Sequence, residues 1–268
     1  MNIFCKELNK EFVDKETMFL ELVKNQSKII ELKKACIKNS DSTYGFFVDK
    51  KAESEKSLSF VKDGFVYPVI NTTNFLDSHG DVHFPNIWNK SLKDKSRKIF
   101  YVTEHNLNLE SVIAFPEDVN AFVKTLTWKD LGFDLEGSTQ ALIYEINKSK
   151  IRIEKIKELF DQKIAFENSV KMRYITMNLA LDSKNPEFSK SKTLWDERID
   201  LIVNKDKANE MGYFWAIDEA SIEKEGCLCL FGSNSATPIL YEAVYSDTSN
   251  KKEPSINDTQ ATKRVFIN

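Results

Sequence analysis

The sequence predicts an α+β fold in which a mostly antiparallel, barrel-like sheet is flanked by helices, with a helical extension at the N-terminus. Two observations predict it. Short runs rich in aromatic and β-branched residues, typical of strands, fill the middle of the chain, and only a few stretches of helical periodicity interrupt them. These strands and helices do not alternate regularly, which argues against a parallel sheet built from repeated βαβ units.

The N-terminal part has the pattern of one long amphipathic helix over residues 10–38. Phe12, Phe19 and Ile30 recur at helical steps with Lys and Glu between them. Its apolar stripe is narrow, so we expect this helix to pack weakly on the rest of the chain or to project from it, with a docked helix as the equal alternative. The stretch 39–56 is rich in Ser, Asp and Lys and predicts a linker.

The remaining elements follow in order along the chain. We expect strands at residues 65–70, 98–102, 120–124, 170–181, 213–217 and 227–231, and helices at residues 148–166 and 194–203. After residue 245 the chain is polar, which predicts a flexible tail. The chain therefore divides into an N-terminal helix and linker (1–56), a folded domain (57–245) and a polar tail (246–268).

Composition is typical of a globular protein. The 268 residues are 41% hydrophobic and 29% charged, with a formal net charge of -3. This balance gives no basic field for nucleic acid or for an anionic membrane. No apolar run approaches the roughly 20 residues that cross a bilayer, and the first ten residues lack the hydrophobic core of a signal peptide. We therefore expect no nucleic-acid partner and no membrane partner.

Cysteine and glycine usage gives no sign of a cofactor. Cys5, Cys36, Cys227 and Cys229 form no Cys-x-x-Cys pair, so we interpret them as small buried residues rather than as disulfide partners or zinc ligands. The eight glycines form neither a G-x-G-x-x-G fingerprint nor a P-loop. We expect no cofactor.

Histidine is the scarcest reactive side chain, with His79, His83 and His105 only. His79, Asp81 and His83 alternate, so an extended chain would project them from one face as metal ligands could. A polar loop is the simpler interpretation, because Gly80 interrupts the strand pattern. A metal-dependent hydrolase that uses these residues, with or without His105, stays an alternative.

Two other segments carry residues suited to nucleophilic catalysis. His105 follows directly after a predicted strand, where an imidazole can act as a general base in a cleft. Ser169 lies where a predicted helix passes into a strand, with Lys171 on the same strand face. A serine hydroxyl needs such a base before it can attack a carbonyl group. Taken singly, each of these residues is commoner as a surface or packed residue.

Read in order, these segments resemble the prohead proteases of tailed phages, a family whose fold is similar to that of the herpesvirus assemblins. Residues 77–85 match the family's turn of the type Asp-x-x-Gly-Asp-Val-x-x-Pro, and residues 90–92 match the Lys-Ser-Leu helix that follows it. Glu104-His105 matches the end of the strand that carries the family's histidine, and residues 168–172 match its serine motif. The family's last strand, which begins with an acidic residue, is matched by residues 225–229, and its small-Asn-x-Ala turn by residues 232–236. The resemblance covers about residues 60 to 242. The chain departs from the family pattern at Asn168, Lys171 and Cys227, where the family often has His, Gly and Ser.

The resemblance implies a serine endopeptidase that cleaves capsid and scaffold proteins during maturation of the prohead, inside the host cytoplasm. It implies His105 as general base, Ser169 as nucleophile and Glu225 as the third catalytic residue. Glu167, Asp182 and Glu219 are poorer choices for that third role. The major capsid protein and the scaffold protein would be its substrates, and a homo-oligomer is expected. A non-enzymatic head or scaffold-associated protein is the other alternative.

Overall fold

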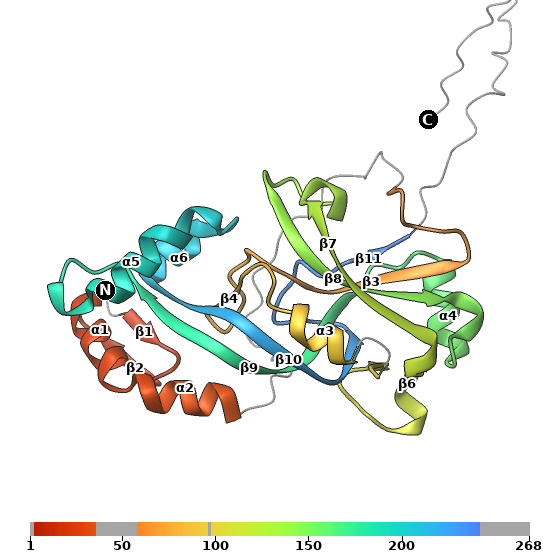
Figure 1. Cartoon of the computed structure of the whole chain (residues 1–268), viewed down its shortest axis with the longest axis horizontal. Helices are drawn as coiled ribbons and strands as arrows, with labels where there is room; N and C mark the ends of the chain where they lie inside the picture. The colour runs from red at the N-terminus through yellow and green to blue at the C-terminus, as the bar shows by residue number, and fades with distance from the viewer. Residues whose placement is uncertain (1–2, 36–57, 96–97, 242–268) are drawn as a thin grey trace, which may run out of the picture.

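The computed structural model describes residues 3–35, 58–95 and 98–241, so the predicted linker and the predicted tail lie outside the described residues. The strands are β1 (Ile3–Cys5), β2 (Lys10–Phe12), β3 (Phe65–Thr72), β4 (Asp81–His83), β5 (Phe100–Thr103), β6 (Val112–Ala114), β7 (Val119–Thr127), β8 (Ser138–Asn147), β9 (Glu167–Leu181), β10 (Tyr213–Cys229) and β11 (Ile239–Leu240). The α-helices are α1 (Lys15–Lys24), α2 (Gln26–Ala35), α3 (Asn89–Lys95), α4 (Glu154–Asp161), α5 (Ser189–Arg198) and α6 (Lys205–Met211). The predicted α+β class is confirmed (Figure 1).

Two sheets form the body of the molecule. In the larger sheet, β10 pairs with β4, β5 and β9, and β5 pairs in turn with β6. The second sheet has the order β11-β3-β8-β7. The second sheet is antiparallel throughout, whereas β10 runs parallel to β4 and β5 and antiparallel to β9. The described strands form no closed barrel.

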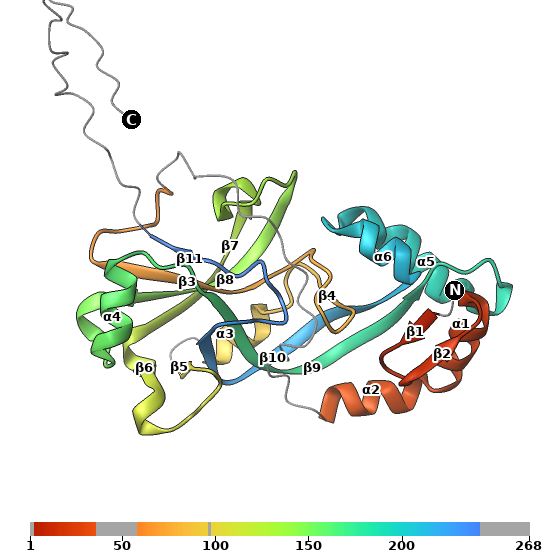
Figure 2. The same cartoon turned by 180° about the vertical axis from the view of Figure 1, so that it is seen from behind.

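The longest strands, β9 and β10, form an antiparallel pair at the centre of this arrangement. Figures 1 and 2 show both strands extending from the N-terminal elements at one end of the molecule into its other half, where Figure 2 labels β5. The sequence predicted two separate strands in place of β10. The polar stretch between them is also strand, because its half-exposed side chains alternate with the buried Ala220 and Ile222.

The predicted single helix over residues 10–38 is wrong. Residues 10–12 form β2, which pairs antiparallel with β1, and two helices follow it. Asp14 starts α1 by accepting the backbone N–H of Thr17, and Asn25 ends it before α2 begins. Helical periodicity in the apolar residues could not reveal these interruptions, because the breaks lie at polar positions.

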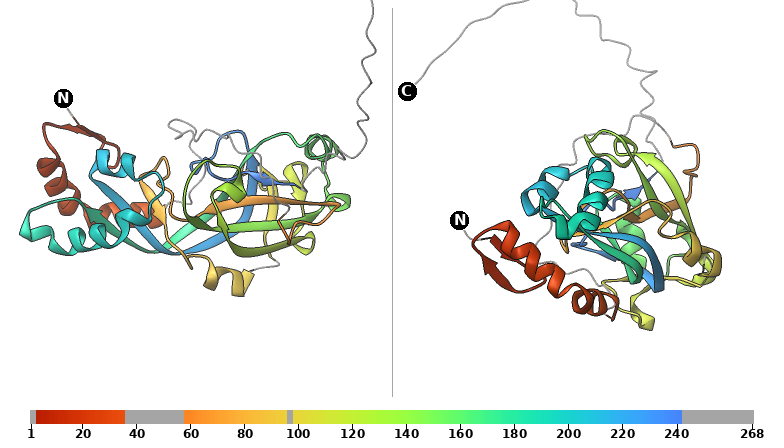
Figure 3. Two further views of the ribbon diagram at one scale, coloured as in Figure 1. Left: turned by 90° about the horizontal axis from the view of Figure 1, so that it is seen from above. Right: turned by 60° about the vertical axis from the view of Figure 1, so that its left-hand side comes forward.

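The N-terminal elements are docked, so the docked alternative is confirmed and the alternative of weak packing or projection is wrong. Met18, Phe19 and Leu22 are fully buried and belong to the same hydrophobic core as β9 and β10. Burial of each such side chain stabilises the fold by roughly 1.5–3 kcal/mol. Figure 3 shows α1 and α2 lying against the end of the β9–β10 pair. None of the described helices is long and apolar enough to cross a membrane.

Candidate active site

A row of four side chains crosses one face of the larger sheet. On β9 and β10, Ser169 lies opposite Cys227; Cys227 is paired with Val102 on β5, and Val102 with Val112 on β6. Residues directly opposite one another on neighbouring strands project to the same face. Ser169 is therefore held beside Cys227, one strand away from the strand that leads to His105.

His105 is held in a strained reverse turn at the end of β5. The turn has Glu104 and His105 at its centre, with φ values of 48° and 56°, and Asn106 donates its N–H to the carbonyl of Thr103 at 2.9 Å. Two consecutive positive φ values are typical of type I′ turns, which favour Asn and Gly rather than Glu and His. Backbone strain of this kind is concentrated at functional sites.

The turn is anchored to the end of β10 at two points. The N–H of Glu104 donates to the carbonyl of Leu228 at 2.9 Å, and the Glu104 carboxylate accepts the N–H of Leu230, also at 2.9 Å. Glu104 thereby offsets part of the cost of its own conformation. With the turn anchored in this way, the imidazole of His105 lies against the protein rather than in solvent, and its side chain is only 6% exposed.

Glu225 reaches the same place through a large bulge in β10. Ile222 lies opposite Met172 and Gly226 opposite Val170, so three residues of β10 face the single residue Lys171 of β9. Lys224, inside the bulge, has a φ of 69°. Bulges commonly lie beside active sites, where they turn a side chain toward its partner. This one turns the carboxylate of Glu225 toward β5.

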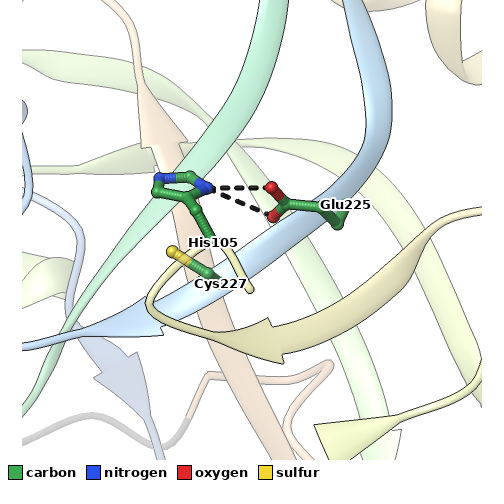
Figure 4. Close-up of side chains that lie close together, drawn as sticks. All are labelled: His105, Glu225 and Cys227. Atoms are coloured by element: carbon green, nitrogen blue, oxygen red, sulfur yellow. Dashed lines mark hydrogen bonds and ion pairs between the residues drawn. The ribbon is translucent and has the colours of Figure 1, made fainter. Parts of the chain in front are cut away.

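His105 and Glu225 meet in a buried hydrogen bond (Figure 4). Nδ1 of His105 lies 2.9 Å from Oε1 and 3.3 Å from Oε2 of Glu225, whose side chain is 0% exposed. An ionised carboxylate can only accept, so Nδ1 donates. A buried carboxylate without such a partner would cost several kcal/mol. The expected contact between Glu225 and His105 is therefore present, and the chemical roles of the two residues stay a prediction.

Cys227 lies next to this pair. Its Sγ, a carboxylate oxygen of Glu225 and a ring nitrogen of His105 are all within 4.8 Å of one another. The sequence named Cys227 only as a replacement for a family serine. The signal that could have found it is the Glu-x-Cys spacing, which puts both side chains on one face of a strand.

Charge in the site is set by burial and by these contacts. Burial disfavours the imidazolium, but the contacts with Cys227 and Glu225 outweigh that effect and raise the pKa of His105 to about 9. The contact with Cys229 and burial together raise the pKa of the Cys227 thiol far above its ordinary value, although His105 acts in the opposite direction. The Cys227 thiol is therefore harder to ionise than an exposed cysteine.

The expected hydrogen bond between Ser169 and His105 is absent. Nε2 of His105 is buried and has no hydrogen-bond partner among the described residues. The reason lies in the strand order: Cys227 of β10 stands between Ser169 and β5, and neighbouring strands are about 4.8 Å apart. Serine–histidine contacts are often loose in enzymes without substrate.

The chain after β10 returns beside Ser169. Asn168 donates from its side-chain amide to the carbonyl of Thr237 at 2.8 Å, and the hydroxyl of Thr237 donates to the carbonyl of Asn168 at 2.7 Å. The N–H of Gly232 donates to Glu167 at 2.7 Å, and a Cβ on Gly232 would lie 3.0 Å from the carbonyl oxygen of Asn168. A glycine is needed at this close approach of the two backbones.

The alternative metal residues do not converge. In residues 3–35, 58–95 and 98–241, His79, Asp81 and His83 form no group with three ligand atoms in reach of one ion. Asp81 instead accepts a hydrogen bond from Lys33 of α2 and another from the Tyr174 hydroxyl at 2.8 Å. This segment therefore joins the N-terminal helices to the sheet.

No protein-family model matches the chain, and neither a curated protein nor a solved structure matches it.

Proposed function

We propose that the chain is a serine endopeptidase of the prohead-protease kind, with Ser169 as nucleophile, His105 as general base and Glu225 as the residue that orients His105. The observation that carries this proposal is the buried hydrogen bond between Nδ1 of His105 and Glu225. It forms at a strained turn, on the sheet that also carries Ser169. In serine-protease triads a carboxylate likewise holds one nitrogen of the histidine, and the other nitrogen has no partner except the nucleophile.

The proposed mechanism follows from which nitrogen holds the proton. Glu225 keeps the proton on Nδ1, so His105 presents the lone pair of Nε2 once it has lost its second proton; with a pKa of about 9, that form prevails only in alkaline solution. That nitrogen takes the proton of Ser169 as its Oγ attacks the peptide carbonyl, and then gives the proton to the leaving amine. Water repeats the sequence on the acyl-enzyme and releases the acid. The charge of Glu225 stabilises the imidazolium between these steps.

Ser169 is a better nucleophile candidate than Cys227, although Cys227 lies close to His105. A cysteine nucleophile acts as a thiolate, which needs a lowered pKa, and the pKa of Cys227 is raised. Cys227 is also fully buried, whereas Ser169 retains 7% exposure. A substrate carbonyl therefore has better access to Ser169.

The substrate class comes from the sequence resemblance. We infer that the substrates are the major capsid protein and the scaffold, cleaved by a homo-oligomer inside the prohead in the host cytoplasm. The barrel-like, assemblin-like arrangement of the strands belongs to the same proposal. A non-enzymatic head protein would share the location and the partners but would leave both proteins intact.

Co-expression of the full chain with its capsid and scaffold proteins tests the proposal. Mass mapping of fragments should find discrete cleavages with the wild-type chain and none with Ser169→Ala or His105→Ala. Cys227→Ala is the matched control and should still cleave, because it removes the neighbouring thiol but not the hydroxyl. Cleavage that survives Ser169→Ala but not Cys227→Ala would assign the reaction to the thiol. Intact substrates in every case would favour the structural protein.

A further inference from the structure

Three different kinds of metal ligand meet at one point in the chain. A ring nitrogen of His105, a carboxylate oxygen of Glu225 and Sγ of Cys227 lie within 4.8 Å of one another, and they are the one such group in the described part of the chain. Glu225 and Cys227 lie on β10, and His105 lies in the turn that follows β5, the strand paired parallel with β10. Figure 4 shows the side chains of Glu225 and Cys227 beside the ring of His105.

A second observation concerns the contact that already joins two of these ligands. Nδ1 of His105 lies 2.9 Å from Oε1 of Glu225, and both side chains are almost fully covered from solvent. Ligand atoms of one tetrahedral ion are separated by little more than this distance, so a cation can take the place of the proton between them. The sulfur of Cys227 is also buried, at 0% exposure of the residue.

We propose that His105, Glu225 and Cys227 bind a zinc ion, with the fourth coordination position left open. Zinc takes nitrogen, oxygen and sulfur ligands at about 2.0–2.3 Å, so tetrahedral ligand atoms lie roughly 3.4–3.8 Å apart. The ligand atoms lie within 4.8 Å of one another, so no pair needs to approach by more than about 1 Å to meet that geometry. Structural zinc sites have four protein ligands, whereas this group supplies three, so water would fill the fourth position.

Charge and ligand type favour zinc over other divalent cations. A thiolate from Cys227 and the carboxylate of Glu225 carry two negative charges, which balance a divalent ion when His105 is neutral. Magnesium and calcium prefer oxygen ligands alone, whereas sulfur with imidazole suits zinc. On binding, the thiol proton and the proton on the ligating nitrogen of His105 pass to solvent as the Zn–S and Zn–N bonds form.

Zinc binding and the proposed proteolysis would exclude each other. An ion that holds His105 and Glu225 removes the base and its orienting carboxylate from catalysis. The metal site itself does not depend on the proposed function, because its ligands need no substrate and no reaction.

The test uses cobalt(II) as a spectroscopic substitute for zinc on the full, reduced chain. We expect a sulfur-to-cobalt charge-transfer band that saturates at one ion per chain and disappears when zinc is added. Cys227→Ser should lose the band and bind zinc roughly 100-fold more weakly, by competition with a chromophoric chelator. Cys229→Ser is the matched control, because Cys229 is buried on the same strand face but lies outside the group; it should keep both.

Failure of a variant to fold must be separated from loss of the site. Circular dichroism of each variant shows whether it is folded, and zinc should raise the thermal midpoint of the wild type and of Cys229→Ser but not of Cys227→Ser. If Cys227→Ser does not fold, the same comparison is made with His105→Ala. A wild-type chain without a charge-transfer band, or a band that persists in folded Cys227→Ser, overturns the proposal.

Discussion

At the scale of single residues, the carboxylate of Glu225 decides which nitrogen of His105 keeps its proton. Its oxygen lies 2.9 Å from Nδ1, and its side chain has no access to solvent. In a buried environment the negative charge also stabilises the imidazolium more strongly than it would in water. Both effects act through His105, so Glu225 is a positioning residue in the proposed reaction.

Glu225→Gln should therefore lower kcat/KM for a capsid-derived peptide by roughly 10⁴-fold while leaving weak residual cleavage, because an amide can hold the ring in the wrong tautomer. Glu223→Gln is the matched control, since Glu223 lies in the same bulge and is paired with Arg173 rather than with His105. Steady-state kinetics of both variants gives the comparison. Equal rates for Glu225→Gln and wild type would remove Glu225 from the mechanism.

Local sequence patterns could reveal part of this site and not the rest. His105 follows a predicted strand, whereas Glu225, 120 positions away, came only from the family resemblance. The approach of Cys227 depends on the parallel register of β5 and β10, which no local pattern specifies. The strand that separates Ser169 from β5 is likewise a property of the sheet order.

At the scale of elements, a buried ion pair fastens α2 to β4. Lys33 donates to Asp81 and, at 3.1 Å, to the carbonyl of His79; its Nζ also lies 3.8 Å from the carboxylate of Glu7. The lysine is only 8% exposed. Because the carboxylates around it are also covered, removal of one charge leaves the others without compensation.

Lys33→Ala should lower the free energy of unfolding by about 3–5 kcal/mol, measured by urea denaturation, since it strands a buried carboxylate. Lys28→Ala on the exposed face of the same helix removes an equal charge and should change stability by no more than about 0.5 kcal/mol. If the two variants unfold at the same urea concentration, the ion pair contributes nothing to docking.

Asp77, beside the same cluster, should make stability depend on pH. Burial, and then the neighbouring charge of Asp81, raise the pKa of Asp77 to about 7 from an ordinary 3.8. Between these values the folded chain holds a proton that the unfolded chain has lost, so stability falls as pH rises from about 4 to about 7 and levels off above that.

Asp77→Asn removes this ionisation and keeps the Oδ1 acceptor for the N–H groups of His79 and Asp81. The free energy of unfolding of the wild type, relative to this variant, should therefore decline across pH 4–7. Urea denaturation at several pH values measures it. A difference that stays constant over this range would show that Asp77 titrates normally.

The elements themselves were predicted unevenly. Strands with strong apolar character, such as β3 and β7, and the amphipathic α4 were expected near their observed positions. The N-terminal helix was predicted as one element, because its polar breaks at Asp14 and Asn25 do not alter the apolar period. The strand β8 was not predicted, although it pairs with both β3 and β7.

At the scale of the whole molecule, the β9–β10 pair connects the N-terminal helices with the candidate site. One end carries the N-terminal helices (Figure 3) and the Lys33 ion pair, and the other carries Ser169, Glu225 and Cys227. A shared hydrophobic core runs along the pair. The candidate site is thus built on rigid strands, which suits the precise placement that covalent catalysis requires.

The central claim is that His105 activates Ser169 as a nucleophile. The most direct measurement is incubation of the full chain with a serine-directed fluorophosphonate, followed by intact mass and peptide mapping. The reaction should be run above pH 9, where His105 is neutral. The Ser169 oxygen would bond to phosphorus as fluoride leaves, which gives one adduct per chain on Ser169. The adduct should disappear in His105→Ala and persist in His79→Ala. A folded chain that stays unmodified, or one labelled equally fast without His105, would contradict the claim.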